Sequence, residues 1–156
     1  MIRAWRLARD PHTALDGEGA RRYGGRWNGI GTAMVYAAAT LSLAALEYLT
    51  HVDPEDAPTD LVALELALPD VALEAWAPDA LPPLWRAAAV PVACRLRGDA
   101  WIASGTGLGV WVPSVVIPPE ANLLLNPAHP AMRGVQLVSR APFAFDPRLL
   151  YRADPR

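Results

Sequence analysis

The residues best suited to chemistry lie in one glycine-rich stretch, residues 21–29 (RRYGGRWNG). Two adjacent glycines allow the backbone to adopt positive φ angles and to approach a ligand closely. Arg26 follows them directly, and its planar guanidinium suits a bidentate contact with phosphate. Trp27 and Asn28 add a stacking surface and an amide. The stretch predicts a loop that binds a phosphate-containing ligand, although a tight turn with exposed charges would share this composition.

Four polar residues further along the chain are candidates for the same site. Tyr36 lies in a short apolar run, and Glu47 lies beside the apolar stripe of a predicted helix. Ser114 follows Pro113, and Asn126 precedes a proline. Each also has an ordinary structural explanation: a core tyrosine, a solvated helix glutamate and two turn-forming residues.

Taken in order, these motifs resemble the RES-domain family, the toxins of bacterial toxin–antitoxin pairs. The resemblance rests on GGRWN, the tyrosine, SLAALEYL, GDAW, VPS and NLLLNPAHP, from about Arg3 to the region of Phe145. It implies a single RES-type domain over residues 1–156. The arginine, tyrosine, glutamate and serine of the family, and the asparagine of its Asn-Pro motif, correspond to Arg26, Tyr36, Glu47, Ser114 and Asn126.

The resemblance implies an α+β, ADP-ribosyltransferase-like fold that binds NAD in a central cleft between two small sheets. Members of the family degrade NAD by phosphorolysis or hydrolysis, or ADP-ribosylate a protein, and an Xre-type helix-turn-helix antitoxin blocks their cleft. NAD is then the substrate of an enzyme, and no cofactor is expected. The implied catalytic residues are Arg26, Tyr36, Glu47 and Ser114, and the implied substrate-binding residues are Arg26, Trp27, Asn28, Tyr36 and Asn126.

The chemistry of the side chains agrees with cleavage of the nicotinamide–ribose bond. This reaction passes through an oxocarbenium-like species, which a nearby carboxylate such as Glu47 stabilises. A tyrosine face attracts the cationic nicotinamide ring, and Arg26 can pair with the pyrophosphate. Ser114 and Asn126 can fix hydroxyl or amide groups by hydrogen bonds.

The residues do not distinguish among three groups that could attack the ribose: phosphate, water and a protein side chain. The sequence shows no second carboxylate near Glu47, which disfavours transfer to protein and suits phosphate, an acceptor that needs no general base. Arg21 and Arg22 could hold inorganic phosphate as a further ligand. Two alternative hypotheses make the protein no enzyme: a non-catalytic module that binds a nucleotide or partner, or a plain interaction protein whose apolar surface pairs with another chain.

Composition limits the class of protein further. The chain has 156 residues, of which 53% are hydrophobic and 19% charged, so we expect one globular domain with part of its apolar surface covered by a partner. The net charge is −2, whereas nucleic-acid-binding domains are usually basic, so we expect no direct binding of nucleic acid by this chain. The chain shows no membrane-length apolar run and no signal peptide, so we expect a cytoplasmic protein. One cysteine and three scattered histidines predict no disulfide and no metal site.

These residues must be positioned by short elements, because sixteen prolines divide the chain. Apolar patterning predicts one helix, capped by Thr40, over residues 41–52 and short helical pieces, broken by prolines and Gly98, over 81–105. Residues 9–31 are predicted as a long ordered loop. The predicted strands span residues 2–7, 33–37, 60–68, 108–112, 122–125, 135–138 and 143–145.

Overall fold

A computed structural model describes residues 1–151 of the chain. Its strands are β1 (Ile2–Arg9), β2 (Val35–Ala38), β3 (Leu61–Leu68), β4 (Glu74–Ala75), β5 (Gly109–Pro113), β6 (Ala121–Leu125) and β7 (Gln136–Pro142). Its α-helices are α1 (Glu18–Tyr23), α2 (Leu41–Leu49), α3 (Val92–Ser104) and α4 (Pro147–Leu150). Four short 3-10 turns are η1 (Asp10–His12), η2 (Pro54–Asp56), η3 (Pro78–Ala80) and η4 (Pro130–Gly134).

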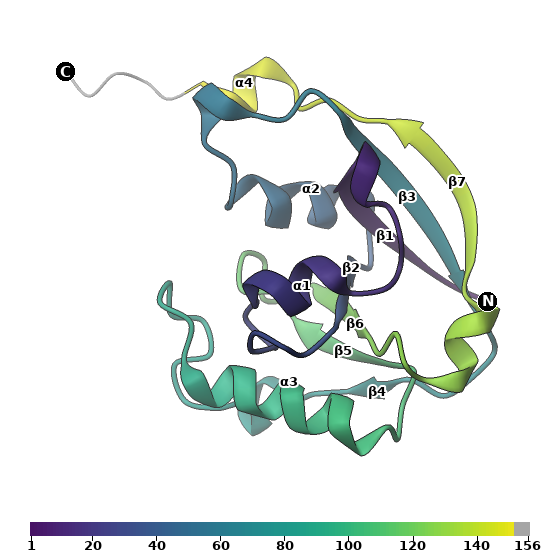
Figure 1. Ribbon diagram of the computed structural model, residues 1–156. Helices are drawn as coiled ribbons and strands as arrows, with labels where there is room; N and C mark the ends of the chain where they lie inside the picture. Colours follow the sequence, from purple (N-terminus) through teal and green to yellow (C-terminus); the bar gives the residue numbers. More distant parts are fainter. Residues whose placement is uncertain (152–156) are drawn as a thin grey trace.

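The seven strands form one sheet in the order β4-β5-β6-β2-β1-β3-β7. Neighbouring strands are antiparallel except β4 and β5, which are parallel. In Figure 1 the sheet is bent, with β1, β3 and β7 along one limb and β4, β5 and β6 along the other. The mixed α/β architecture is confirmed, but the expected pair of separate sheets is wrong. The pairing of Trp5 in β1 with Ala38 in β2 joins the two limbs into one sheet.

Two helices cover the same face of the central strands. Leu43 and Ala44 of α2 share an apolar cluster with Ala38 of β2, while Cys94 of α3 belongs to the same apolar cluster as Leu124 of β6. Tyr36 is paired with Leu124 and lies two residues before Ala38, so Ala38 and Leu124 project from the same side of the sheet. The side chain of Tyr36 therefore projects from the face that α2 and α3 cover.

Helix α2 begins as predicted and ends earlier. The Thr40 hydroxyl accepts a hydrogen bond from the Leu43 amide at 3.1 Å, which confirms the N-cap. The predicted end was residue 52, but the helix stops at Leu49. The hydroxyl of Thr50 donates to the carbonyl of Glu47 at 2.8 Å, which satisfies a last-turn carbonyl without another helical residue.

Three predictions of local structure are wrong. The loop over 9–31 contains α1, which begins where the Glu18 amide donates to the Asp16 carboxylate. Helix α3 runs unbroken through Gly98, because a glycine is tolerated inside a helix, and here another segment contacts it. Residues 143–145 form no strand, since Phe143 and Phe145 pack instead in the apolar cluster that includes α2.

The other predicted strands exist with shifted ends, and the strand over 135–138 extends to Pro142. Sequence patterning missed β4 and α4, which are two and four residues long. Within residues 1–151, no helix combines the length and apolar character that a membrane crossing requires.

Candidate active site

Glu47 lies at the centre of a hydrogen-bonded group that we call the glutamate cluster: Glu47, Ser114 and Asn122. The Ser114 hydroxyl and the Asn122 amide each donate to Glu47 Oε1, both at 2.6 Å. Ser114 is fully buried, and its oxygen also accepts from the amides of Val116 and Ile117 at 3.1 and 3.0 Å. The cluster thus fixes one carboxylate oxygen, while Oε2 has no hydrogen-bond partner within the described residues.

A second group, the tyrosine cluster, consists of Tyr36, Asn28 and the backbone of Trp27. The Tyr36 hydroxyl donates to Asn28 Oδ1 at 2.6 Å and accepts from the Trp27 amide at 3.1 Å. Asn28 Nδ2 donates to three backbone carbonyls, at 2.8 to 3.1 Å, and Asn28 is fully buried. The Tyr36 hydroxyl is thus used inside the protein, and its half-buried side chain packs against the apolar cluster that includes Trp27.

The two clusters lie on one face of the sheet. Ala38 is paired with Asn122, and Tyr36 with Leu124, on neighbouring antiparallel strands. Cross-strand partners share a face, and residues two apart on a strand project from the same side. Tyr36 and Asn122 are therefore offset by two residues on this face, about 7 Å along the strands. The sequence predicted Glu47, Ser114, Tyr36 and Asn28 as site residues, and the structure places them in these two adjoining clusters.

Arg26 has a different environment from the one predicted. Its Nη1 atom donates to the carbonyls of Trp85 and Ala87 at 2.9 and 2.8 Å. These bonds tie the glycine-rich loop to the turn before α3. The side chain of Trp27 is buried in the apolar cluster that includes Cys94 and Trp101 of α3, and the ring centroids of Trp27 and Trp76 are 5.5 Å apart. Stacking of Trp27 on a substrate therefore stays a prediction that the buried position of the ring disfavours.

Arg6 is a candidate that sequence reasoning missed. It lies on β1, where Nη1 reaches across to the carbonyl of Tyr36 at 3.2 Å. Its Nε atom is buried and has no hydrogen-bond partner among residues 1–151. Burial lowers the pKa of Arg6, and the charge of Asp16 partly offsets this. An arginine between apolar residues in a predicted strand was the available signal, because such a position normally holds a core residue.

Asn126 lies at the other end of β6 from the glutamate cluster. Four residues separate it from Asn122, or about 13 Å along an extended strand. Its Oδ1 accepts from the Ala128 amide at 3.0 Å, and its buried side chain forms the turn after β6. The structure therefore does not bring Asn126 together with Glu47, and its role as a substrate ligand stays a prediction. Within the described chain, no group of three or more His, Cys, Asp or Glu side chains is placed to hold a metal ion.

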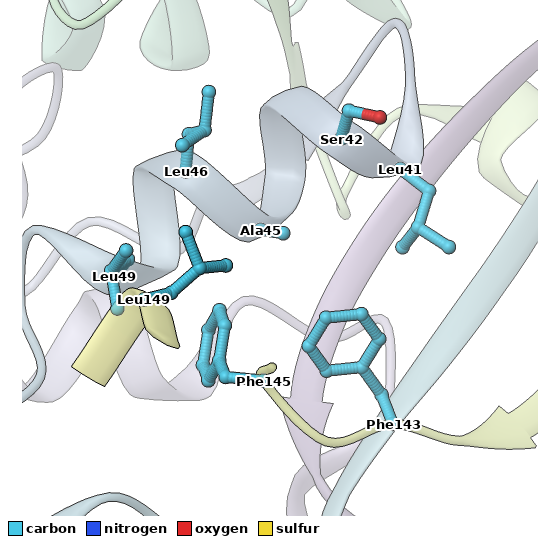
Figure 2. A pocket seen from close by; sticks show the side chains of 8 residues that line it. All are labelled: Leu41, Ser42, Ala45, Leu46, Leu49, Phe143, Phe145 and Leu149. Carbon is cyan, nitrogen blue, oxygen red and sulfur yellow. The ribbon is translucent and has the colours of Figure 1, made fainter. Parts of the chain in front are cut away.

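An apolar groove of about 420 Å³ lies on the side of α2 opposite Glu47. Figure 2 shows the side chains of α2 and of the C-terminal segment that line it. Residues 41, 45 and 49 face this groove, and helical spacing places residue 47 on the far side of the helix. The groove is thus separate from both polar clusters. Its lining residues are Leu41, Ser42, Ala45, Leu46, Leu49, Phe143, Phe145 and Leu149.

Comparison with known proteins shows similarity over nearly the whole chain. The sequence model described as "RES domain" matches residues 3–146. The chain is 37% identical over 156 residues to a protein of Sphingobium sp. (strain YBL2) named "Prs ADP-ribosylating toxin", covering 96% of this chain and 97% of that one. It is 38% identical over 134 residues to "Toxin Res" of Yersinia enterocolitica, covering 85% of this chain and 88% of that one.

Among solved structures, the chain resembles one from the crystal structure of the M. tuberculosis MbcT–MbcA toxin–antitoxin complex. The TM-score is 0.73 at 22% sequence identity, and the match covers 96% of this chain and 86% of that chain. This likeness shows a shared fold.

The tyrosine cluster predicts a loss of stability in alkali. Burial raises the pKa of Tyr36 above its usual value near 10. As pH rises, the unfolded chain therefore loses the Tyr36 hydroxyl proton before the folded chain does. The contribution of neutral Tyr36 to the unfolding free energy is complete below about pH 10 and is lost as pH rises through the folded-state pKa. The chain has no lysine to titrate in this range, but burial also raises the pKa of Tyr48 and of the Cys94 thiol, and both add to the slope. We expect the unfolding free energy to fall above pH 10, by up to about 1.4 kcal/mol per pH unit for one tyrosine.

Chemical denaturation at several pH values would measure this slope. Tyr36→Phe should reduce it and, by leaving Asn28 Oδ1 and the Trp27 amide unpaired, lower neutral-pH stability by about 1–3 kcal/mol. Tyr23→Phe is the control, because Tyr23 is 79% exposed. Equal alkaline slopes for the Tyr36 variant and the wild type would contradict the expectation.

Proposed function

The chain belongs to the RES domain family, and we propose that it is the toxin of a bacterial toxin–antitoxin pair that consumes NAD by cleaving the nicotinamide–ribose bond. The names of the Sphingobium and Yersinia relatives support a toxin. The single observation that carries the proposed chemistry is the arrangement of Glu47. One oxygen of its carboxylate is held by Ser114 and Asn122, and the other is left available to a substrate.

This arrangement suits stabilisation of a developing positive charge. Departure of nicotinamide leaves an oxocarbenium-like ribose, and a carboxylate fixed beforehand needs no reorganisation as that charge appears. Two donors to Oε1 hold the carboxyl group in one orientation, so Oε2 can face the ribose. In this proposal Ser114 and Asn122 orient Glu47, and Glu47 acts on the reacting carbon.

The tyrosine cluster provides one further binding group. Arg6 is proposed as another: its side chain leaves β1 on the opposite side from Trp5, beside the one residue pair that joins β1 to β2, and it bonds the Tyr36 carbonyl. The ring of Tyr36 projects from the same sheet face as Asn122, where it can meet the cationic nicotinamide by a cation–π contact. Arg6 is a second candidate for the pyrophosphate, because its buried Nε has no hydrogen-bond partner within the described chain, while Arg26 binds its two carbonyls through Nη1 alone. NAD is consumed as the substrate in this scheme, with no separate cofactor.

The arginine pair proposed to hold inorganic phosphate is already paired. Arg21 and Arg22 both donate to the carboxylate of Glu18, with distances of 2.6 to 3.0 Å, and these bonds lower the pKa of Glu18 to about 2. Phosphate would have to compete with this carboxylate. Phosphorolysis and hydrolysis therefore both remain within the proposal.

Mono-ADP-ribosylation of a cellular protein is the second candidate function. The observation that favours it is the name of the Sphingobium relative, an ADP-ribosylating toxin that matches 96% of this chain. Both candidates share cleavage of the same bond and differ in the acceptor. We also propose an antitoxin as the protein partner, since the structural neighbour is a toxin solved with one; the resemblance implies the Xre helix-turn-helix type.

Incubation of the purified protein with NAD, with and without inorganic phosphate, tests the proposed function. Phosphorolysis should yield ADP-ribose-1″-phosphate only when phosphate is present, and hydrolysis should yield ADP-ribose in both reactions. Labelled NAD added to a cell extract should mark a protein band if the acceptor is a side chain. Intact NAD in all three reactions would reject the proposal.

Glu47→Gln should separate catalysis from structure. Glutamine keeps an oxygen that can accept from Ser114 and Asn122 but loses the negative charge. We expect kcat to fall by about 10²-fold or more with little change in KM for NAD, because the charge acts mainly in the transition state. Glu55→Gln, on the exposed η2 turn, is the matched control. Wild-type kcat in the Glu47 variant would show that its charge has no part in the reaction.

Arg6→Gln should affect substrate binding, whereas Arg26→Ala should affect stability. We expect Arg6→Gln to raise KM for NAD by about tenfold or more through loss of a charged contact, with stability kept because a buried, incompletely paired cation is removed. Arg26→Ala should lower the unfolding free energy by about 1–3 kcal/mol, since it leaves the carbonyls of Trp85 and Ala87 unpaired. Steady-state kinetics and thermal unfolding of both variants check this. An unchanged KM for Arg6→Gln would remove Arg6 from the substrate site.

A further inference from the structure

Helix α3 contacts the backbone of the glycine-rich loop through two adjacent residues, Gly98 and Asp99. The amide of Gly29 donates to Asp99 Oδ1 at 2.9 Å. At Gly98 a Cβ atom would lie 1.6 Å from the carbonyl oxygen of Trp27, so the helix and loop backbones are in direct contact there. One turn earlier, Arg95 Nε donates to the carbonyl of Gly25 at 3.1 Å. Residues of α3 thus contact the loop at Gly25, Trp27 and Gly29.

The part of the loop that α3 contacts, residues 25–29, supplies the hydrogen-bond partners of the Tyr36 hydroxyl. Trp27 supplies the amide that donates to the Tyr36 hydroxyl, and Asn28 supplies the oxygen that accepts from it. Both lie between the contacts at Gly25 and Gly29. At Gly29 a Cβ atom would lie 2.9 Å from Asp99 Oδ2, which shows how closely the carboxylate approaches this backbone. A shift of Gly29 would therefore move Asn28 and release the Tyr36 hydroxyl.

We propose that Asp99 is a positioning residue for Tyr36, acting through the Gly29 amide and Asn28 without touching the substrate. The inference rests on the proposed function, in which the Tyr36 ring meets the nicotinamide. The side-chain oxygen of Asp99 holds the Gly29 amide by one hydrogen bond, which an asparagine oxygen can also accept. Asp99 thereby sets the place of a binding group that lies on a different element, the strand β2.

The matched control is Glu74, a second carboxylate that binds α3. Its Oε1 accepts from Trp101 Nε1 at 3.0 Å, on the same helix but away from the glycine-rich loop. Glu74→Ala and Asp99→Ala each remove the acceptor of one hydrogen bond between α3 and another segment. Asp99→Asn keeps an oxygen in place and should restore the behaviour of the wild type.

The first measurement is amide hydrogen exchange at Trp27, which reports the bond to the Tyr36 hydroxyl whether or not the protein acts on NAD. We expect Asp99→Ala to speed exchange at Trp27 by about tenfold, with Asp99→Asn and Glu74→Ala close to wild type. Unchanged protection at Trp27, with faster exchange at Gly29 alone, would overturn the proposal. If Asp99→Ala does not fold, Asp99→Glu displaces the acceptor by one methylene and replaces it in the series.

The second measurement is the steady-state kinetics of NAD consumption. A misplaced Tyr36 ring should weaken ground-state binding, so we expect KM to rise about fivefold or more while kcat stays within about twofold. A merely structural role would lower the active fraction, and so the apparent kcat, at constant KM. That result, or unchanged kinetics, would overturn the proposal. If the wild type does not consume NAD, the proposed function fails, while exchange at Trp27 still decides whether Asp99 positions the tyrosine cluster.

Discussion

The side chain of Asn28 is fully buried, and every hydrogen bond that the structure gives it is made to the protein itself. Its amide nitrogen holds the carbonyls of Ala20, Gly29 and Thr32, and its oxygen accepts from Tyr36. A buried amide left unpaired would be costly, so these bonds must form together. They join α1, the glycine-rich loop and β2. The shape of the loop is consequently determined by the need to satisfy one side chain.

The two arginines near the proposed site illustrate how location decides the role of a charge. Arg26 follows two glycines, as a phosphate ligand would, yet it holds a turn together by binding two carbonyls. Arg6 lies in a strand, where a charge is unexpected, and it retains an unpartnered nitrogen within residues 1–151. Each arginine binds backbone carbonyls through Nη1, so the difference between them is that the unpartnered Nε of Arg6 is buried, where an incoming anion would relieve an unsatisfied donor.

Sequence patterning predicted the elements that carry strong local signals. The Thr40 cap located the start of α2, and the apolar repeat in residues 61–68 located β3. The pairing of Ser114 with Glu47 could not be derived from the residues themselves, because 67 positions separate them and only the arrangement of α2 beside β5 and β6 brings them together. The family resemblance nominated both. It gave no role to Arg6, Asn122 or Asp99; Asn122 and Asp99 lie within the NLLLNPAHP and GDAW motifs, but what they do appears only in their contacts with other elements.

The pairing of β2 with β6 also limits how the gene can change in length. Side chains alternate between the two faces of a strand, so deleting one codon within β6 would flip the residues on one side of the deletion and turn either Asn122 away from Glu47 or Leu124 away from the face of Tyr36. Single-codon insertions and deletions in this strand should therefore be eliminated by selection wherever the activity is needed. The exposed connection that contains η2, between α2 and β3, has no such alternation to preserve, and length variation among descendants of this gene should accumulate there.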